Sequence, residues 1–235
     1  MTRDPAKLDV VLIPGLLNDG DLWRDQISGL SDIARCWVGD MTQAATLRAC
    51  AESILAKAPD RFALVGFSLG GFVAQDIMRI APHRVSHLAL LDTSIKPDTP
   101  ERAAQRRALV RAARMPGKFH GFGDRLLSSY LHPDHLTDDL LASRVRAMTE
   151  RLGPEVFARQ SEFERLDGAD VLRHAHCPVL ILCGENDLIT PLQDHKEMAF
   201  LSESATLVVV PHSGHLTPLE NPAFVTHALR QFLLG

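Results

Sequence analysis

Six short apolar runs, which contain few polar residues, place the strongest constraint on the fold of this chain. A strand inside a parallel sheet is buried on both faces, so its sequence is almost continuously hydrophobic instead of alternating. Segments with helical periodicity separate the runs, and repeated strand–helix alternation is typical of a doubly wound α/β domain. The sequence therefore predicts a mostly parallel sheet of about six strands. These strands are residues 8–13, 36–38, 62–65, 85–91, 179–183 and 206–210.

One long segment without a strand interrupts this alternation. Residues 95–175 have helical patterns but no convincing strand, although core strands are predicted on both sides of them. We therefore predict an α/β core formed by residues 1–94 and 176–235, with a helical lid inserted at residues 95–175. The helices expected in the core are residues 22–30, 44–56, 69–80, 192–201 and 218–232, and those expected in the insertion are residues 101–114, 124–131, 136–152 and 155–166.

Two of the core helices begin with favourable capping sequences. Thr190 is followed three positions later by Gln193, and Thr217 by Glu220, with a proline directly after each threonine. A threonine with glutamine or glutamate at this spacing forms a capping box, and proline suits the first helical turn. Both threonines are therefore predicted to cap helices that begin at the carboxyl edge of the sheet, where open α/β folds bind ligands.

Composition limits the size of the core and the classes of partner that we expect. The chain has 235 residues, of which 46% are hydrophobic, and this is enough for a large core. Its formal net charge is −4 and no basic stripe is visible, so we expect no nucleic-acid partner. The apolar run at residues 10–13 is too short for a signal peptide, and no stretch approaches the ~20 residues that cross a bilayer. The four cysteines form no CxxC pair, which fits a reducing compartment. We expect a cytoplasmic protein with no membrane partner; the oligomeric state is left open.

The segment from Gly66 to Gly70 reads G-x-S-x-G, with Ser68 at its centre. A predicted strand precedes the motif and a helical pattern follows it, as in a nucleophile elbow. Such a turn strains the serine backbone, and glycines allow the strand and the helix to pass close together. The motif is common by chance, and a glycine-rich turn of a nucleotide-binding protein would resemble it. Neither phosphate-loop pattern, G-x-x-x-x-G-K-[ST] or G-x-G-x-x-G, is present, so we predict that Ser68 is a nucleophile.

A serine hydroxyl needs a base to take its proton. His215 lies in a glycine-containing loop between the last predicted strand and the last predicted helix, at the same edge of the sheet as Ser68. We predict that His215 is this base. His212 is the competing residue, but it lies nearer the strand and is assigned to local packing.

The imidazole in turn needs an orienting carboxylate. Asp187 follows the strand at residues 179–183 and precedes a helix, so we predict that it is the catalytic acid. Asp92, at the end of the strand 85–91, and Glu185, two residues before Asp187, are the alternatives. The chain order of serine, acid and histidine is the order found in α/β-hydrolases.

Attack on an ester carbonyl creates an oxyanion, which backbone N–H groups stabilise. One donor is expected to be the N–H of Leu69, directly after the nucleophile. The second is expected from the loop after the first strand, at Leu16, with Leu17 as the near alternative. A tight Pro-Gly turn explains the same loop without any catalytic role.

These residues resemble the α/β-hydrolase superfamily. The segments that carry the resemblance are IPGLLNDGDLW, GFSLGG, LLDTS, CGENDLITP and PHSGHLTPLENP, which span residues 13–222. The resemblance implies catalysis by Ser68, Asp187 and His215, a helical lid, and neither a metal nor an organic cofactor. Many relatives have His-Gly where this chain has Pro14-Gly15, and many begin with two further strands, for which the residues before position 8 leave no room. The sheet is therefore expected to be a reduced, all-parallel one.

Two further patterns have simpler explanations than a binding site. The histidine pairs at positions 83 and 87, 132 and 135, and 174 and 176 lack the additional ligands that a zinc site needs, so we expect no metal. Five arginines make the first helix of the insertion basic. We expect them to form a solvent-facing surface; attraction of a substrate that bears a carboxylate is the alternative. They are Arg102, Arg106, Arg107, Arg111 and Arg114.

Together these features predict a serine hydrolase that cleaves an ester-like bond of a small or medium substrate through an acyl-enzyme on Ser68. The same residues could instead cleave a lactone, a thioester, an amide or a carbon–carbon bond, or transfer an acyl group. A ligand-binding protein without catalysis is the third hypothesis, and the presence of all three catalytic residues argues against it.

Overall fold

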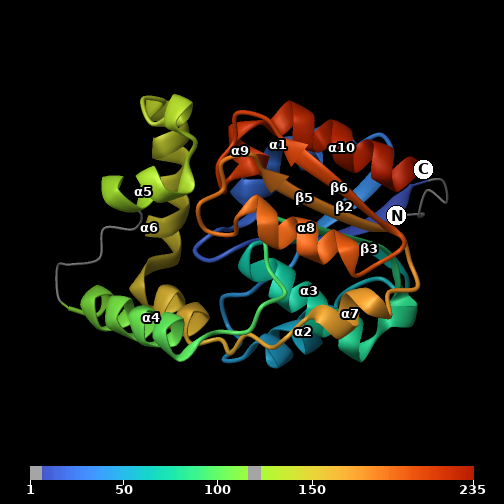
Figure 1. The fold of residues 1–235 in the computed structure, drawn as a ribbon, viewed down its shortest axis with the longest axis horizontal. Coiled ribbons are helices and arrows are strands. Elements are labelled where there is room, and N and C mark those ends of the chain that lie inside the picture. Colours follow the sequence, from blue (N-terminus) through green and yellow to red (C-terminus); the bar gives the residue numbers. More distant parts are fainter. Residues whose placement is uncertain (1–6, 116–122) are drawn as a thin grey trace.

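The computed structural model describes residues 7–115 and 123–235. Its centre is one six-stranded sheet in which every neighbouring pair of strands is parallel and the order is β2-β1-β3-β4-β5-β6 (Figure 1). The predicted fold class and the reduced, all-parallel sheet are confirmed. The strands are β1 (Leu8–Ile13), β2 (Ala34–Val38), β3 (Phe62–Phe67), β4 (Val85–Leu91), β5 (Val179–Gly184) and β6 (Ala205–Val210).

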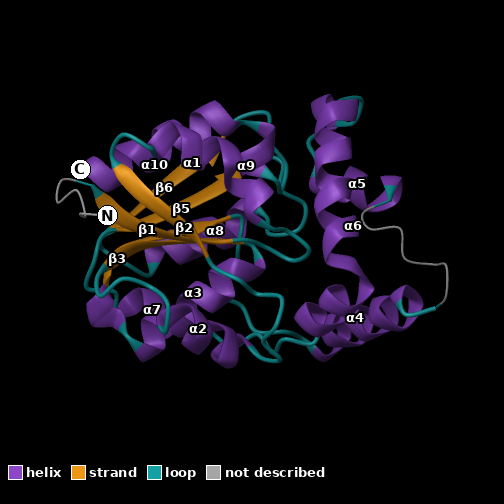
Figure 2. Ribbon diagram, turned by 180° about the vertical axis from the view of Figure 1, so that it is seen from behind, coloured by secondary structure: helices purple, strands orange, loops and turns teal. Residues whose placement is uncertain are grey.

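Helices cover both faces of the sheet, and each face has its own hydrophobic core (Figures 1 and 2). The short helix η1 (Gly20–Trp23), α1 (Arg24–Leu30), α9 (Thr217–Glu220) and α10 (Pro222–Leu234) lie on one face. The other face carries α2 (Leu47–Leu55), α3 (Leu69–Ile80), α7 (Ala169–Arg173) and α8 (Leu192–Phe200). Because both faces are covered, β3 and β5 are buried along their whole length, which explains their continuous hydrophobic sequences.

The insertion between β4 and β5 stands beyond the carboxyl ends of the strands (Figure 1). Its described residues form α4 (Pro100–Ala113), α5 (Asp124–Tyr130), η3 (Pro133–His135) and α6 (Asp139–Ser161). The described residues between β4 and β5, which also include α7 on the face of the sheet, contain no strand. The α6 helix kinks at Gly153, whose φ is 74°, directly before Pro154. An ion pair of 2.6 Å between Arg144 Nη1 and Asp25 Oδ2 connects α6 to α1. Among the described residues, no helix is at once sufficiently long and apolar to span a bilayer.

The prediction of one helix at residues 218–232 is wrong. The chain forms α9 and α10 instead, with a break at Asn221, whose φ is −138° and ψ is 65°. Pro222 follows directly, and proline cannot donate the backbone hydrogen bond that would continue α9. The Asn221 side chain accepts a hydrogen bond from Phe224 N and so begins a second helix. Because of this break, α9 is a separate short helix that begins directly after the loop of His215.

The turn between β3 and α3 brings two segments into very close approach. A Cβ atom on Gly70 would lie 2.3 Å from the carbonyl oxygen of Ile13 and 2.4 Å from that of Pro14. A Cβ atom on Gly66 would meet the backbone of Gly70 at 2.6 Å. These are backbone atoms, which cannot move aside as a flexible side chain can. The glycines of the motif are therefore required by packing.

We expect Gly70→Ala to lower the free energy of unfolding by about 2 kcal/mol or more, since overpacking against backbone costs ~1–3 kcal/mol. For a chain of this size the midpoint of thermal unfolding should fall by roughly 4–8 °C, as circular dichroism would measure. Gly20→Ala is the control, because its Cβ would lie 3.9 Å from the nearest atom, Cγ2 of Val38. Equal melting temperatures of the two variants would contradict the packing argument.

Candidate active site

Ser68 lies between the end of β3 and the start of α3 in a strained backbone conformation. Its φ is 49° and its ψ is −115°, values that a residue with a side chain rarely adopts. Hydrogen bonds hold the backbone there: Ser68 N donates to Leu91 O at 2.9 Å, and Thr93 Oγ1 donates to Ser68 O at 2.7 Å. The end of β4 thus supports the turn from the neighbouring strand. Such locally stored strain is typical of functional residues.

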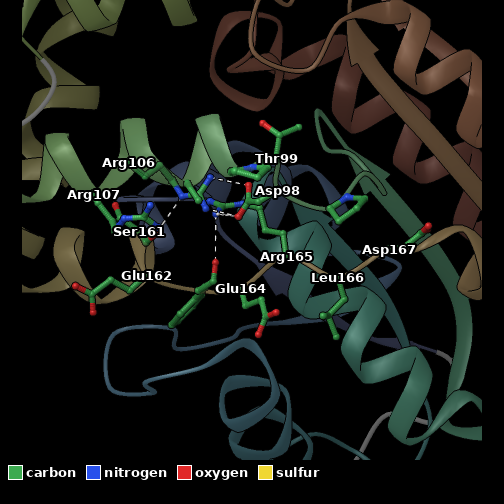
Figure 3. Close-up of a pocket in the computed structure, with 14 residues that line it drawn as sticks. Asp98, Thr99, Arg106, Arg107, Ser161, Glu162, Glu164, Arg165, Leu166 and Asp167 are labelled. Carbon is green, nitrogen blue, oxygen red and sulfur yellow. Dashed lines mark hydrogen bonds and ion pairs between the residues drawn. The ribbon is translucent and has the colours of Figure 1, made fainter.

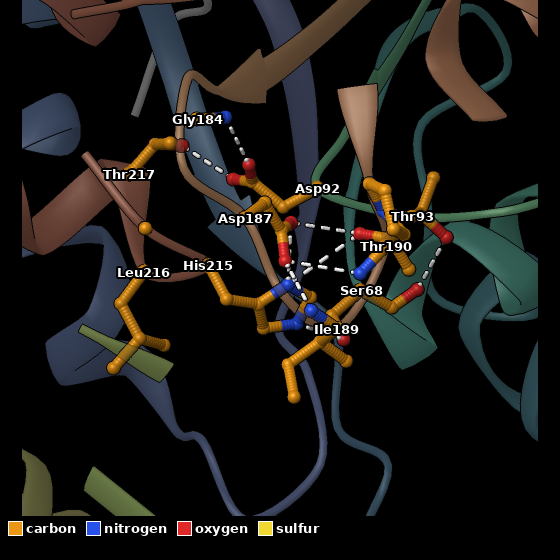
Figure 4. Close-up of polar contacts among 12 residues, drawn as sticks. Ser68, Asp92, Thr93, Gly184, Asp187, Ile189, Thr190, His215, Leu216 and Thr217 are labelled. Carbon is orange, nitrogen blue, oxygen red and sulfur yellow. Dashed lines mark hydrogen bonds and ion pairs between the residues drawn. The ribbon is translucent and has the colours of Figure 1, made fainter. Parts of the chain in front are cut away.

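Three side chains distant in the sequence form one hydrogen-bonded chain (Figure 4). The Ser68 Oγ lies 2.8 Å from His215 Nε2, and His215 Nδ1 lies 2.7 Å from Asp187 Oδ2. A carboxylate only accepts, so the Nδ1–H donates to Asp187 and Nε2 is left as the acceptor for the Ser68 hydroxyl. His215 is 1% exposed and Asp187 is 4% exposed, so water competes little for these bonds. The structure therefore brings the three predicted residues together in the arrangement of a catalytic triad.

Local hydrogen bonds keep Asp187 ionised despite its burial. Its Oδ1 accepts from Ile189 N at 2.8 Å and from Thr190 N at 3.0 Å, and its Oδ2 accepts from Thr190 Oγ1 at 2.8 Å. Burial by itself raises the pKa of Asp187, but His215 and the donors of Thr190 outweigh this effect and hold the pKa below its usual value. The carboxylate is therefore charged and faces the imidazole.

The alternative acid, Asp92, is bound elsewhere. Its Oδ1 accepts from Gly184 N at 2.9 Å, and its Oδ2 accepts from the Thr217 hydroxyl. Burial, and next the nearby charge of Asp187, raise the pKa of Asp92 well above its usual value. Asp92 therefore joins the ends of β4 and β5 to the start of α9 (Figure 4). The other alternative, Glu185, is exposed and accepts from His212 N at 3.3 Å.

Both capping predictions are wrong. The residue before α8 is Pro191 and the residue before α9 is Leu216, and neither threonine side chain caps its helix. The Thr190 and Thr217 hydroxyls donate instead to the two buried carboxylates of the site. A hydroxyl that donates to an ionised carboxylate forms a stronger hydrogen bond than one that accepts from a backbone N–H, so at Thr190 the tertiary contact prevails over the local pattern.

Leu16 and Leu69 line the same cavity as Ser68, which has a volume of about 380 Å³. The competing oxyanion donor, Leu17, is already paired: its N–H donates to Oε1 of Gln160 at 2.9 Å. Gln160 lies on α6 and is fully buried, and its Nε2 donates to Met41 O at 3.4 Å. One side chain of the insertion thus holds the loops that follow β1 and β2. The sequence contained no signal for this residue, because its partners are 119 and 143 positions away.

We expect Gln160→Leu to lower the free energy of unfolding by about 1–3 kcal/mol, because Leu17 N–H would be buried without an acceptor. The loop that carries Leu16 would also lose its anchor, so we expect kcat for an ester substrate to fall more strongly than KM rises. Chemical denaturation and steady-state kinetics measure the two effects. Gln193→Leu makes the same substitution at an exposed position of α8 and should change neither quantity. An unchanged kcat in Gln160→Leu would contradict the positioning role.

Two aromatic rings enclose the imidazole of His215. Phe67, at the end of β3, lies 5.4 Å from it between ring centroids, and Tyr130, from α5, meets it edge-on at 5.2 Å. Tyr130 O also accepts from His215 N at 2.7 Å. Burial raises the pKa of the Tyr130 phenol to about 12. The insertion therefore contributes directly to the surroundings of the base, which sequence reasoning did not detect.

The packing role expected for His212 is wrong, because 75% of its side chain is exposed. Its Nδ1 lies 3.2 Å from Asp134 Oδ2, and His132 Nδ1 lies 3.4 Å from the same oxygen. Among the described residues, these three form the one group whose donor atoms could hold a metal ion, all within 4.8 Å of one another. Asp134 N donates to His132 Nδ1, so this ring nitrogen already has a hydrogen-bond partner within the group.

Comparisons with known proteins identify the fold family of this chain. The family model of the alpha/beta hydrolase fold matches residues 10–222. A pimeloyl-(acyl-carrier protein) methyl ester esterase from Nitrosomonas europaea is 28% identical, with 91% of each chain covered. A pyrrolizixenacetamide deacetylase from Xenorhabdus hominickii is 27% identical, with 95% of this chain and 84% of the relative covered.

A solved structure also shows the fold of this family. A thermophilic esterase from Thermogutta terrifontis superposes with a TM-score of 0.86 at 29% identity, and the match covers 97% of this chain and 90% of the esterase. These relatives support the prediction that the chain is an enzyme. The family model covers most of the chain, including Ser68, Asp187 and His215. The chain belongs to the α/β-hydrolase fold family.

Proposed function

We propose that this α/β-hydrolase is a serine esterase, which cleaves an ester-like bond of a small or medium substrate through an acyl-enzyme on Ser68. The observation that carries the proposal is the buried hydrogen-bonded chain from Ser68 Oγ through His215 to Asp187, with distances of 2.8 and 2.7 Å. An esterase is favoured over other hydrolases because one relative with 28% identity and one solved structure with 29% identity are named as esterases.

In the first half-reaction, Ser68 Oγ attacks the ester carbonyl carbon while His215 Nε2 takes the hydroxyl proton. Asp187 stabilises the imidazolium that forms and keeps Nε2 directed at the serine. The carbonyl oxygen becomes an oxyanion, for which we propose the backbone N–H groups of Leu16 and Leu69. Leu17 is the less suitable donor, since its N–H is paired with Gln160. Each such donor typically contributes ~10²–10³ in rate.

His215 then gives its proton to the leaving alcohol, and the carbon–oxygen bond of the ester breaks. The product is an acyl group on Ser68 Oγ. In the second half-reaction, His215 Nε2 takes a proton from water, which attacks the acyl carbon by the same route. The acid leaves, Ser68 regains its proton from the imidazolium, and the enzyme returns to its starting state.

The cavity determines which substrates can reach Ser68. Its volume of about 380 Å³ is near the lower end of ordinary ligand pockets. Leu109 from α4 and Phe157 from α6 line it together with Leu188, so the insertion forms part of the wall of the cavity. We propose that the insertion is a lid over this pocket. The four cysteines are unpaired, which fits the cytoplasmic location that we also propose.

The test is a panel of p-nitrophenyl acetate, p-nitrophenyl butyrate, a lactone and a thioester, together with labelling by a fluorophosphonate probe. We expect turnover of the two activated esters and labelling of the folded protein with a stoichiometry near one. Labelling without ester turnover would direct the search to the other acyl substrates. A folded protein that is neither labelled nor active would overturn the proposal in favour of a ligand-binding role.

A further inference from the structure

We propose that arginines of the insertion form a carboxylate-binding subsite in the cavity of Ser68, so that the preferred substrate is an ester that bears a free carboxylate. The subsite consists of Arg102 and Arg106, from α4, and Arg165, which follows α6. This inference rests on the proposed esterase function and names the class of its substrate.

The first observation is an arginine pair that shares one carboxylate (Figure 3). Arg106 Nη1 lies 2.6 Å from Asp98 Oδ1 and its Nη2 pairs with Oδ2, while Arg165 Nη1 lies 3.4 Å from the same Oδ2. The exposed fractions of the side chains are 20% for Arg106, 13% for Arg165 and 15% for Asp98. Two guanidinium groups and one carboxylate leave one net positive charge in a largely buried place.

Neighbouring contacts hold the two guanidinium groups in position. Arg106 Nε donates to Ser161 O at 3.0 Å, and Arg165 lies over the ring of Phe72 at 5.7 Å. Burial, and next the charge of Arg106, lower the pKa of Arg165, as expected where two cations compete for one anion. The cluster is therefore preorganised and would gain from a second carboxylate.

The second observation is the place of this cluster in the wall of the active-site cavity. Arg102, Arg106 and Arg165 line the cavity together with Ser68. Arg102 lies four positions before Arg106 on α4, so the two side chains share one face of the helix. For Arg106 the solvent-facing interpretation of the basic helix is therefore wrong, whereas Arg107 and Arg111 are exposed.

The third observation is the distribution of acidic groups on the two sides of the cluster. Among the described residues that line the cavity of Ser68, Asp98 is the one acidic residue. The neighbouring cavity, of about 510 Å³, is lined in addition by Glu162, Glu164 and Asp167 (Figure 3). A carboxylate is therefore favoured on the side of Ser68 and opposed by like charges on the other side.

Lys96 does not add to this attraction, although it lines the same cavity. Its Nζ lies 2.8 Å from both Asp194 Oδ1 and Glu197 Oε2, so two carboxylates already compensate its charge. The attraction for a substrate anion thus comes from the arginines. The apolar side chains of Leu109, Phe157 and Leu188 line the same cavity and suit the methylenes between the carboxylate and the ester.

The experiment compares monomethyl and dimethyl esters of succinate, glutarate, adipate and pimelate, with release of acid followed by a pH indicator. The two members of each pair have the same chain length and differ in charge. We expect the ratio of kcat/KM for the monoester to that for the diester to be about ten or more at the best chain length. This is the size of effect that a hydrogen bond to a charged group typically gives. The ratio should fall when the salt concentration is raised. A second pair, 4-acetoxybutyrate and its methyl ester, places the carboxylate on the alcohol side.

Arg102→Gln should reduce the ratio several-fold, because it removes one exposed charge of the subsite and leaves the Asp98 cluster intact. Arg111→Gln removes an equivalent charge from the same helix outside the cavity, and should leave the ratio as it is in the parent. A ratio near one in both substrate pairs, or the same ratio in Arg102→Gln as in the parent, would overturn the subsite and leave the esterase standing.

Binding without catalysis separates the two proposals. In Ser68→Ala, we expect monomethyl adipate to raise the melting temperature and dimethyl adipate to raise it less, with the difference lost when Arg102→Gln is added. If the parent hydrolyses neither ester but Ser68→Ala still prefers the monoester, the esterase proposal fails and the subsite stands. If Ser68→Ala binds both esters equally, the subsite fails whatever the activity.

Discussion

Ser68→Ala is expected to lower kcat/KM for p-nitrophenyl butyrate by about 10⁴-fold or more and to abolish labelling by fluorophosphonates. The hydroxyl oxygen of Ser68 is the one nucleophilic atom at hydrogen-bond distance from His215 Nε2, 2.8 Å away, among the described residues. Without it, the remaining groups can bind and polarise an ester but cannot form the acyl-enzyme. The rate left over should be that of water attacking within the oxyanion site.

The control for this prediction is a second serine of the same cavity. Ser94 is buried and lines the pocket, and its Oγ accepts from Lys96 N at 3.1 Å. Ser94→Ala should change kcat/KM by no more than a few-fold. Circular dichroism and the melting temperature should show that Ser68→Ala is folded, because the substitution removes only the hydroxyl and keeps the Cβ atom and the backbone conformation. Parent-like turnover by a folded Ser68→Ala protein would sink the mechanism.

Asp187→Asn is expected to lower kcat by about 10⁴-fold, the second largest effect. The amide of asparagine would donate to His215 Nδ1, so the imidazole would carry its proton on Nε2 and could no longer take one from Ser68. Loss of the carboxylate would also leave the imidazolium of the transition state without its counter-charge. Steady-state kinetics with p-nitrophenyl butyrate measure the loss, and an unfolding curve verifies that the protein is folded.

Asp92→Asn makes the same substitution as Asp187→Asn at the alternative acid, so comparing the two variants shows which carboxylate acts with His215. The raised pKa of Asp92 indicates a carboxyl that holds its proton easily, and asparagine resembles that neutral form. We expect a fall in kcat of less than about tenfold, together with a modest loss of stability from the altered bonds to Gly184 and Thr217. If Asp92→Asn lost 10⁴-fold and Asp187→Asn retained activity, the acid would be Asp92.

Much of the site was visible in the sequence because each proposed catalytic residue lies in the turn or loop that follows the carboxyl end of a strand. Parallel strands present all their carboxyl ends at one edge of the sheet, so Ser68, Asp187 and His215 had to gather there once the strand ends were recognised. Helix starts in the same region were predicted less well. The capping pattern at Thr190 and at Thr217 is a local rule, and both hydroxyls are drawn instead to carboxylates that only the folded chain buries nearby.

Sequence alone predicted the sheet, the turn at Ser68 and the three residues that the structure joins by hydrogen bonds, because hydrophobic periodicity and short glycine motifs act over a few residues. Only the tertiary structure favours Leu16 over Leu17 as the proposed oxyanion donor, since the Leu17 N–H donates to Gln160, 143 positions away. The same holds for the pairing of Asp98 with Arg106 and Arg165. Contacts of this kind depend on where the insertion folds back over the sheet. The spacing of residues along the chain does not predict which of them this folding brings together.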